Sequence, residues 1–260
     1  MTPLVLSIET ATRAGSIAVA RGQRVLAAHE GSADVSHSIN LLWDIENVLQ
    51  RAELALKDIE LFAAASGPGS FTGLRIGLAT VKAFAATLKR ACAGVPTLHA
   101  IAYGAGASPA TVALLPAGRG EVYLQIFSVS EEKIVRPLNR PQHIAPAKIF
   151  AEIESFPYLK WAGVERAPAL LEEIERLKER QAELIFEDDE GDARLQMPGH
   201  RRRWVIAPPA AASLAESIAL LAVTQYRDET VSAEALRATY VRPSDAELNE
   251  RCLPQSPYAR

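Results

Sequence analysis

The residues best suited to bind a ligand lie in the run from Ser66 to Gly73. Glycine permits positive φ and close backbone approach, and a hydroxyl at the start of a helix can cap its free amides. Such a loop could hold an anion through the following residues: Ser66, Gly67, Gly69, Ser70, Thr72 and Gly73. The same residues suit a plain strand–turn–helix junction. We favour the junction, because the Lys-Ser or Lys-Thr pair of a phosphate loop and the spacing of a dinucleotide motif are both missing.

The sequence offers no set of residues for catalysis. None of the five histidines is followed by another four residues later, the spacing that binds a metal from one helix face. The two cysteines, Cys92 and Cys252, are far apart, and the nucleophile motif G-x-S-x-G is absent. Glu9 could bind a metal–nucleotide or accept hydrogen bonds from its own turn, and we favour the turn. We therefore predict no catalytic residue and no metal.

The composition is that of a globular protein that stays in the cytoplasm. Hydrophobic residues make up 48% and charged residues 23%, and the net charge of -3 creates no general attraction to nucleic acid. The first residues lack the basic start of a signal peptide, and apolar runs such as 218–223 are too short to cross a membrane. Two distant cysteines fit a reducing compartment.

The predicted elements occur twice in the same order, which indicates an α/β protein of two similar lobes, each a mixed sheet with flanking helices. In the first half we predict strands at 4–8, 16–20, 24–29, 61–65 and 95–98, and helices from Ser36 or Ser38 to 55, at 72–89 and at 100–107. In the second half we predict strands at 111–115, 121–129, 133–137, 158–162 and 204–206, and helices at 146–153, 167–181 and 211–226.

The lobes are assigned to residues 1–106 and 107–243, followed by a tail at 244–260. Residues 187–203 depart from the repeated pattern, because an acidic cluster is followed by three consecutive arginines, Arg201 to Arg203. We expect a mobile polar loop there, and contact of the arginines with RNA phosphates stays open as an alternative.

Two predicted helices of the first lobe carry more apolar surface than one sheet needs. In the first, one stripe seats the helix, while Ile39 and Trp43 point away from it. In the second, a stripe with Gly73, Gly77 and Phe84 has small residues that would let a neighbouring helix approach. Either the second lobe covers these surfaces or helices of another chain do. The candidate partner-binding residues are Leu41, Leu42, Trp43, Ile45, Leu74, Ile76, Gly77, Leu78, Val81 and Phe84.

The first hundred residues resemble the TsaB family, formerly named YeaZ. The resemblance is carried by Leu4 to Thr12, by His37-Ser38 with Leu41-Leu42, and above all by the specific run from Ser66 to Gly77. Near the other end, Tyr240-Val241-Arg242-Pro243 resembles a further segment of the family. Glu9 stands where the family usually has Asp, which weakens any phosphate or metal role at that position.

The resemblance implies a duplicated actin-like, or RNase H-like, fold and a task in tRNA modification. The resemblance implies a scaffold protein in the formation of threonylcarbamoyladenosine beside the anticodon of tRNAs that read ANN codons. The catalytic paralogue TsaD would transfer the threonylcarbamoyl group. The resemblance also implies pairing with TsaD through the first two helices, a homodimer when alone, an ATPase partner TsaE, and tRNA contact only through the complex. No intrinsic cofactor is implied, and ATP or ADP would belong to the assembled complex.

Two enzymatic alternatives remain at this point. One is a metal-dependent peptidase or glycopeptidase, which would need a metal pair or an activated nucleophile that the sequence does not offer. The other is an independent actin-like nucleotide-binding enzyme, which would hydrolyse ATP as an isolated chain.

Overall fold

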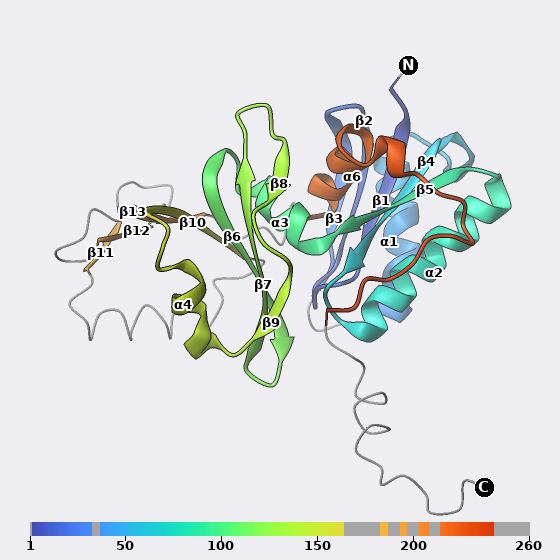
Figure 1. The fold of residues 1–260 in the computed structure, drawn as a ribbon. Helices are drawn as coiled ribbons and strands as arrows, with labels where there is room; N and C mark the ends of the chain where they lie inside the picture. The colour runs from blue at the N-terminus through green and yellow to red at the C-terminus, as the bar shows by residue number, and fades with distance from the viewer. Residues whose placement is uncertain are drawn as a thin grey trace, which may run out of the picture.

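The computed structural model describes residues 2–32, 37–163, 183–186, 193–196, 203–207 and 214–241. They form two mixed sheets, which lie on opposite sides of a pair of helices (Figure 1). The first sheet has the strand order β3-β2-β1-β4-β5. Its strands are β1 (Leu4–Glu9), β2 (Ser16–Arg21), β3 (Arg24–Glu30), β4 (Leu61–Gly67) and β5 (Ala91–Pro96).

The second sheet repeats the arrangement of the first. An antiparallel meander is followed by two strands that add in parallel, so β8-β7-β6-β10-β13 corresponds to β3-β2-β1-β4-β5. Its strands are β6 (Ser108–Gly118), β7 (Glu121–Val129), β8 (Val135–Pro137), β9 (Gln142–Ile144), β10 (Tyr158–Gly163), β11 (Glu183–Phe186), β12 (Ala193–Gln196) and β13 (Arg203–Ile206). The repeated order of strands predicted from the sequence is confirmed for the described residues.

The helices complete a layered molecule. Helices α1 (His37–Arg51) and α2 (Phe71–Leu88) cover the outer face of the first sheet, and α3 (Thr97–Gly104) and α6 (Leu214–Thr224) lie between the two sheets. The outer face of the second sheet is covered by α4 (Ile149–Ile153). Short 3-10 turns lie at Leu56–Asp58, Pro146–Lys148 and Arg227–Glu229. Among the described residues, the second sheet and α4 therefore do not cover α1 and α2, whereas residues 230–241 pack beside α2.

Side-chain alternation explains the layers. Along β1, Leu4, Leu6 and Ile8 point toward α1 and α2, whereas Val5 belongs to the core that contains α3 and α6. Successive side chains of a strand alternate between the two faces of its sheet, so a strand buried on both faces must be apolar throughout. All residues of β1 and β4 are buried, and both strands are apolar except for Ser7, Glu9 and Ser66.

Helix α6 is anchored at both of its ends. At its beginning, Ser7 Oγ donates to the carbonyl of Ala215 at 2.6 Å, and the Ala215 amide donates to Ser16 Oγ at 3.1 Å. Beyond its end, the side chain of Gln225 pairs with the backbone of Val135 on β8: Oε1 accepts from the Val135 amide at 2.7 Å, and Nε2 donates to the Val135 carbonyl at 2.8 Å. Although α6 lies within the range assigned to the second lobe, it packs mainly on β1 and β2 of the first sheet. The division at residue 106 stays a prediction.

Several predicted elements differ in the structure. The expected loop at 187–203 contains strand β12, which pairs with β11 and β13; its residues 187–192 and 197–202 lie outside the described part, as does the helix predicted at 167–181. The strand predicted at 95–98 begins and ends earlier, because Thr97 and Leu98 already belong to α3. By length and composition α2 could cross a membrane, a test that core helices also pass, and here it packs along β4.

Candidate functional site

The glycine-rich turn between β4 and α2 is bound to the chain itself. The Ser70 amide donates to the carbonyl of Ala11 at 2.8 Å, and Ser70 Oγ caps α2 by accepting from the amide of Gly73 at 3.1 Å. On the other side, the carbonyl of Ser66 accepts a hydrogen bond of 2.6 Å from the amide of Thr239. The hydroxyl predicted to cap the helix is therefore the one on Ser70.

The glycines of this turn serve close packing. A Cβ atom at Gly67 would lie 2.4 Å from the carbonyl oxygen of Thr239, and Gly67 has φ of 112°. A Cβ at Gly69 would lie 2.5 Å from that of Ala11. Such distances exclude any side chain, so the turn needs glycine in order to fit against its neighbours. This is the arrangement of a strand–turn–helix junction, as the favoured interpretation expected.

Glu9 ends β1 as a buried carboxylate. Its Oε1 accepts from the Thr12 amide and its Oε2 from the Thr12 hydroxyl, both at 2.7 Å. A buried carboxylate is stable only where donors satisfy it, and the turn supplies them. The expectation that Glu9 holds its own turn is confirmed. Among the described residues, no group of three or more His, Cys, Asp or Glu side chains could hold a metal ion.

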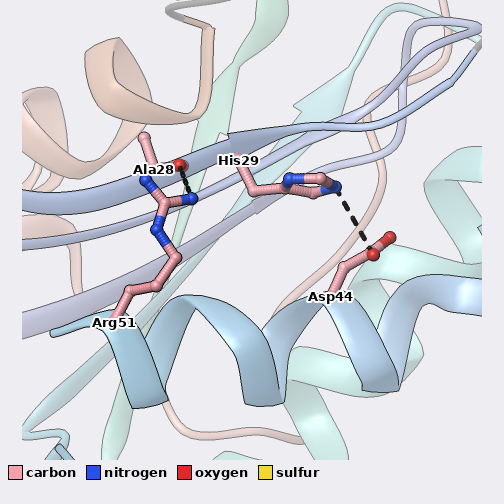
Figure 2. A network of polar contacts seen from close by, with 4 residues as sticks. All are labelled: Ala28, His29, Asp44 and Arg51. Carbon is pink, nitrogen blue, oxygen red and sulfur yellow. Dashed lines mark hydrogen bonds and ion pairs between the residues drawn. The ribbon is translucent and has the colours of Figure 1, made fainter. Parts of the chain in front are cut away.

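Two polar contacts hold α1 on the edge strand β3 (Figure 2). Asp44 Oδ1 lies 3.4 Å from His29 Nε2, and Arg51 Nη1 donates to the carbonyl of Ala28 at 3.0 Å. They lie on the side of α1 that faces the sheet, together with the buried residues Leu41 and Ile45. Because α1 is held from this side, its opposite side is presented outward in a fixed orientation.

The outward side of α1 carries two large apolar residues. Leu42 is 65% exposed and Trp43 is 64% exposed. Trp43 was expected to point away from the sheet, and Leu42 was one of the candidate partner-binding residues. The prediction that Leu41 and Ile45 face a partner is wrong, because the core of the first lobe buries both. Ile39 lies where side chains are outside the described part.

On α2, most of the predicted partner-binding residues face the sheet instead. Leu74, Leu78 and Val81 belong to the core, and a Cβ atom at Gly77 would lie 2.3 Å from Thr10 Oγ1 of the same chain. Phe84 is half-buried and packs on the core ring of Phe62, with 5.7 Å between ring centroids. The glycine stripe therefore lets a turn of this chain approach α2, and the prediction that Gly77 faces a partner helix is wrong.

The small residues that α2 presents outward are alanines. Ala79 and Ala83 are exposed one helical turn apart, with the half-buried Ile76 beside them. We call the set Leu42, Trp43, Ile76, Ala79 and Ala83 the outer helical face. Neither alanine was predicted, because the glycines were taken as the small residues of the stripe. The spacing of Ala79 and Ala83, which follow Arg75 at intervals of four residues, could have revealed them.

The strongly shifted titratable groups lie away from the outer helical face. Burial between the layers lowers the pKa of His99 from 6.5 to about 4, and His99 Nδ1 lies 2.5 Å from the hydroxyl of Tyr226. Burial also raises the pKa of the Cys92 thiol above 9.0. A neutral imidazole and a protonated thiol inside the protein are packing residues in this environment.

Comparison with known proteins identifies the family. The family model described as "TsaD: tRNA N6-adenosine threonylcarbamoyltransferase" matches residues 31–174. The tRNA threonylcarbamoyladenosine biosynthesis protein TsaB of Escherichia coli is 33% identical over 133 residues, which cover 50% of this chain and 57% of that protein. TsaB of Bacillus subtilis is 27% identical over 124 residues, 47% of this chain and 54% of that protein. The chain thus spans about half the length of these relatives.

A solved structure matches over nearly the whole chain. YeaZ from Pseudomonas aeruginosa superposes with a TM-score of 0.68 at 24% identity, and the match covers 92% of this chain and 99% of that one. The layered architecture is therefore that of YeaZ, and the predicted two-lobed actin-like fold class is confirmed. Because the family model covers more than half of the sequence, the chain belongs to the TsaD family of tRNA N6-adenosine threonylcarbamoyltransferases, in which it is similar to the TsaB, or YeaZ, proteins.

Proposed function

We propose that this protein is a non-catalytic subunit of the machinery that makes threonylcarbamoyladenosine in tRNA. Its role is to bind a TsaD-like catalytic paralogue, which carries out the transfer. One structural observation supports this role most directly. The outer helical face lies on the side of the first sheet opposite the second lobe, and two of its large apolar side chains are about two-thirds exposed.

The chemistry of the outer helical face suits another pair of helices. Leu42 and Trp43 supply apolar area, and the alanines of α2 allow close approach of a helix backbone. Stable association needs roughly 800 Å² on each partner, which two adjacent helices can supply. The same face would pair two copies of this chain when the catalytic subunit is absent. We propose that a TsaE-like ATPase joins the complex and that tRNA is bound only by the assembly.

The proposal of a non-catalytic role is supported by the contacts that the candidate site residues make. Glu9 and the glycine-rich turn are engaged with the chain itself, and Leu41 stands four residues after His37, where a second histidine would complete a helical metal motif. We propose that the chain holds no nucleotide of its own and that ATP or ADP belongs to the complex. A cytoplasmic location follows from the proposed substrate. These features argue against both the peptidase and the independent nucleotide-binding enzyme.

The test is association with a purified TsaD-like subunit, measured by gel filtration and calorimetry. Ala83→Trp should abolish the complex by blocking close helix approach, and Trp43→Ala should weaken it about tenfold or more through lost apolar contact. Leu138→Ala is the matched control, since Leu138 is an exposed apolar residue of the second lobe. Wild-type affinity in both Ala83→Trp and Trp43→Ala would refute the proposal, as would peptide or ATP hydrolysis by the isolated chain.

A further inference from the structure

An exposed aromatic cluster lies at the beginning of α2. The guanidinium carbon of Arg75 lies 3.8 Å from the ring centroid of Phe71, whose ring is also 5.3 Å from that of Tyr240, at an angle of 40°. Phe71 is 38% exposed and Tyr240 47% exposed. Two aromatic rings and a stacked cation left in solvent are typical of a recognition surface. We call these three residues the aromatic cluster.

The aromatic cluster is continuous with the outer helical face. Phe71, Arg75, Ala79 and Ala83 follow one another at intervals of four residues, and all four are exposed. Residues spaced in this way form one ridge along a helix, and ridges are the units by which helices pack together. A helix that contacts the two alanines would therefore extend along the same ridge to Arg75.

We propose that the aromatic cluster binds a carboxylate side chain of the TsaD-like partner, and this inference rests on the function proposed above. In the part of the chain that the structure describes, Arg75 has no carboxylate within 4 Å. A guanidinium that stacks on a ring keeps its N–H groups in the ring-parallel plane, where they can pair with both oxygens of a carboxylate.

A protein carboxylate fits this surface better than an RNA phosphate. The exposed neighbours of Arg75 along α2 are Phe71, Thr72 and Ala79, none of which is basic. RNA binding ordinarily depends on several cations along the phosphate backbone. In the described ranges, Arg75 stands beside small and apolar residues of α2, which matches an acidic side chain on an otherwise apolar helix.

The position of Tyr240 is fixed by residues 230–241, which we call the C-terminal strap. Val231 and Cys92 exchange two backbone hydrogen bonds of 3.0 and 2.8 Å, which joins the strap to the edge strand β5. The strap's own Leu236 is buried against the core of the first sheet, and the amide of Thr239 donates to the carbonyl of Ser66. The aromatic cluster is therefore organised before the partner arrives, which lowers the entropy cost of binding.

The experiment compares affinities of variants for the TsaD-like subunit by calorimetry at low and high salt. Arg75→Glu should weaken binding about tenfold or more, and Arg75→Lys less, because a lysine cannot pair bidentately. The advantage of wild type over Arg75→Glu should shrink with added salt. Lys89→Glu is the control, because it makes the same charge change at an exposed position at the other end of α2. Thermal melting of the free proteins checks that each variant is folded.

The outcomes separate this inference from the proposed function. If wild type binds and both Arg75→Glu and Tyr240→Ala bind equally well, the aromatic cluster is not a contact and the inference is wrong. If Arg75→Glu lowers the affinity for tRNA, measured by fluorescence anisotropy, but leaves the affinity for the TsaD-like subunit unchanged, the ligand is a phosphate and the inference is overturned. If wild type does not bind the TsaD-like subunit, the proposed function fails, and the inference fails with it.

Discussion

The hydroxyl of Thr10 donates a hydrogen bond of 2.8 Å to the carbonyl of Gly73. This bond joins the turn after β1 to the first turn of α2, and it brings Thr10 to the place where a side chain at position 77 would stand. The glycines of α2 therefore allow a close contact with the turn at Thr10 of the same chain.

Replacing Gly77 by alanine should therefore destabilise the fold. The new Cβ would lie 2.3 Å from Thr10 Oγ1, which cannot turn away without losing its bond to Gly73. We expect a loss of about 2 kcal/mol or more, measured by urea unfolding. Thr72→Ala, at an exposed position of the same helix, should stay within about 0.5 kcal/mol of wild type. Equal stability of Gly77→Ala and wild type would contradict this account.

Glu9 is expected to matter for stability. Glu9→Ala leaves the Thr12 amide and hydroxyl without these acceptors inside the protein, at a cost of about 1–3 kcal/mol. Glu9→Gln keeps one carbonyl oxygen as an acceptor and should lose less. Unfolding curves for the two variants provide the measurement, and the order of their stabilities is the critical result. A Glu9→Ala protein as stable as wild type would show that the turn holds without the carboxylate.

His99 should make the protein less stable in acid. Its folded pKa of about 4 lies below the ordinary value of 6.5, so between these values the unfolded chain binds the extra proton. The contribution of His99 to stability is therefore fully present above about pH 6.5 and is lost as the pH drops toward 4, about 3 kcal/mol in total. His99→Gln should flatten this part of the stability curve. An unchanged slope in His99→Gln would assign the acid sensitivity to other groups.

The C-terminal strap should protect the thiol of Cys92. Leu236→Ala removes a buried side chain from the strap. Residues 230–241 should then detach from β5 more often and expose it. In a Cys252→Ser background, we expect a thiol reagent to modify Cys92 at least about tenfold faster than in wild type. Ala235→Ser, at an exposed strap position, is the matched control and should react at the wild-type rate. Slow modification in the Leu236→Ala protein would mean that the strap does not limit access.

Local patterns were enough to predict most of the architecture. Alternating or continuous apolar runs placed strands such as 121–129 at their observed bounds, and the repeated order of elements indicated two sheets. The position of α6 was not predictable in this way. Its anchors are Ser7, Ser16 and Val135, and a pairing between residues about 90 or 200 positions apart leaves no periodic signal in the sequence.

The candidate surface was predicted only in part. Apolar excess on α1 and α2 correctly indicated exposed side chains, and Trp43 was assigned to the outward side. Helical periodicity alone could not decide which side of α2 meets the sheet, since both stripes are apolar. The turn containing Thr10 packs against Gly77 and so determines which side of α2 faces the sheet, and that turn is distant in sequence from Gly77.

The double anchoring of α6 has a mechanical consequence. Opening the space between the two sheets would require the helix to release either the serines at one end or the strand backbone at the other. A protein held together in this way would bind a partner as a rigid body. Little of the binding free energy would then be lost to restricting internal motion. Any partner that binds α1 and α2 would then meet a surface of constant shape.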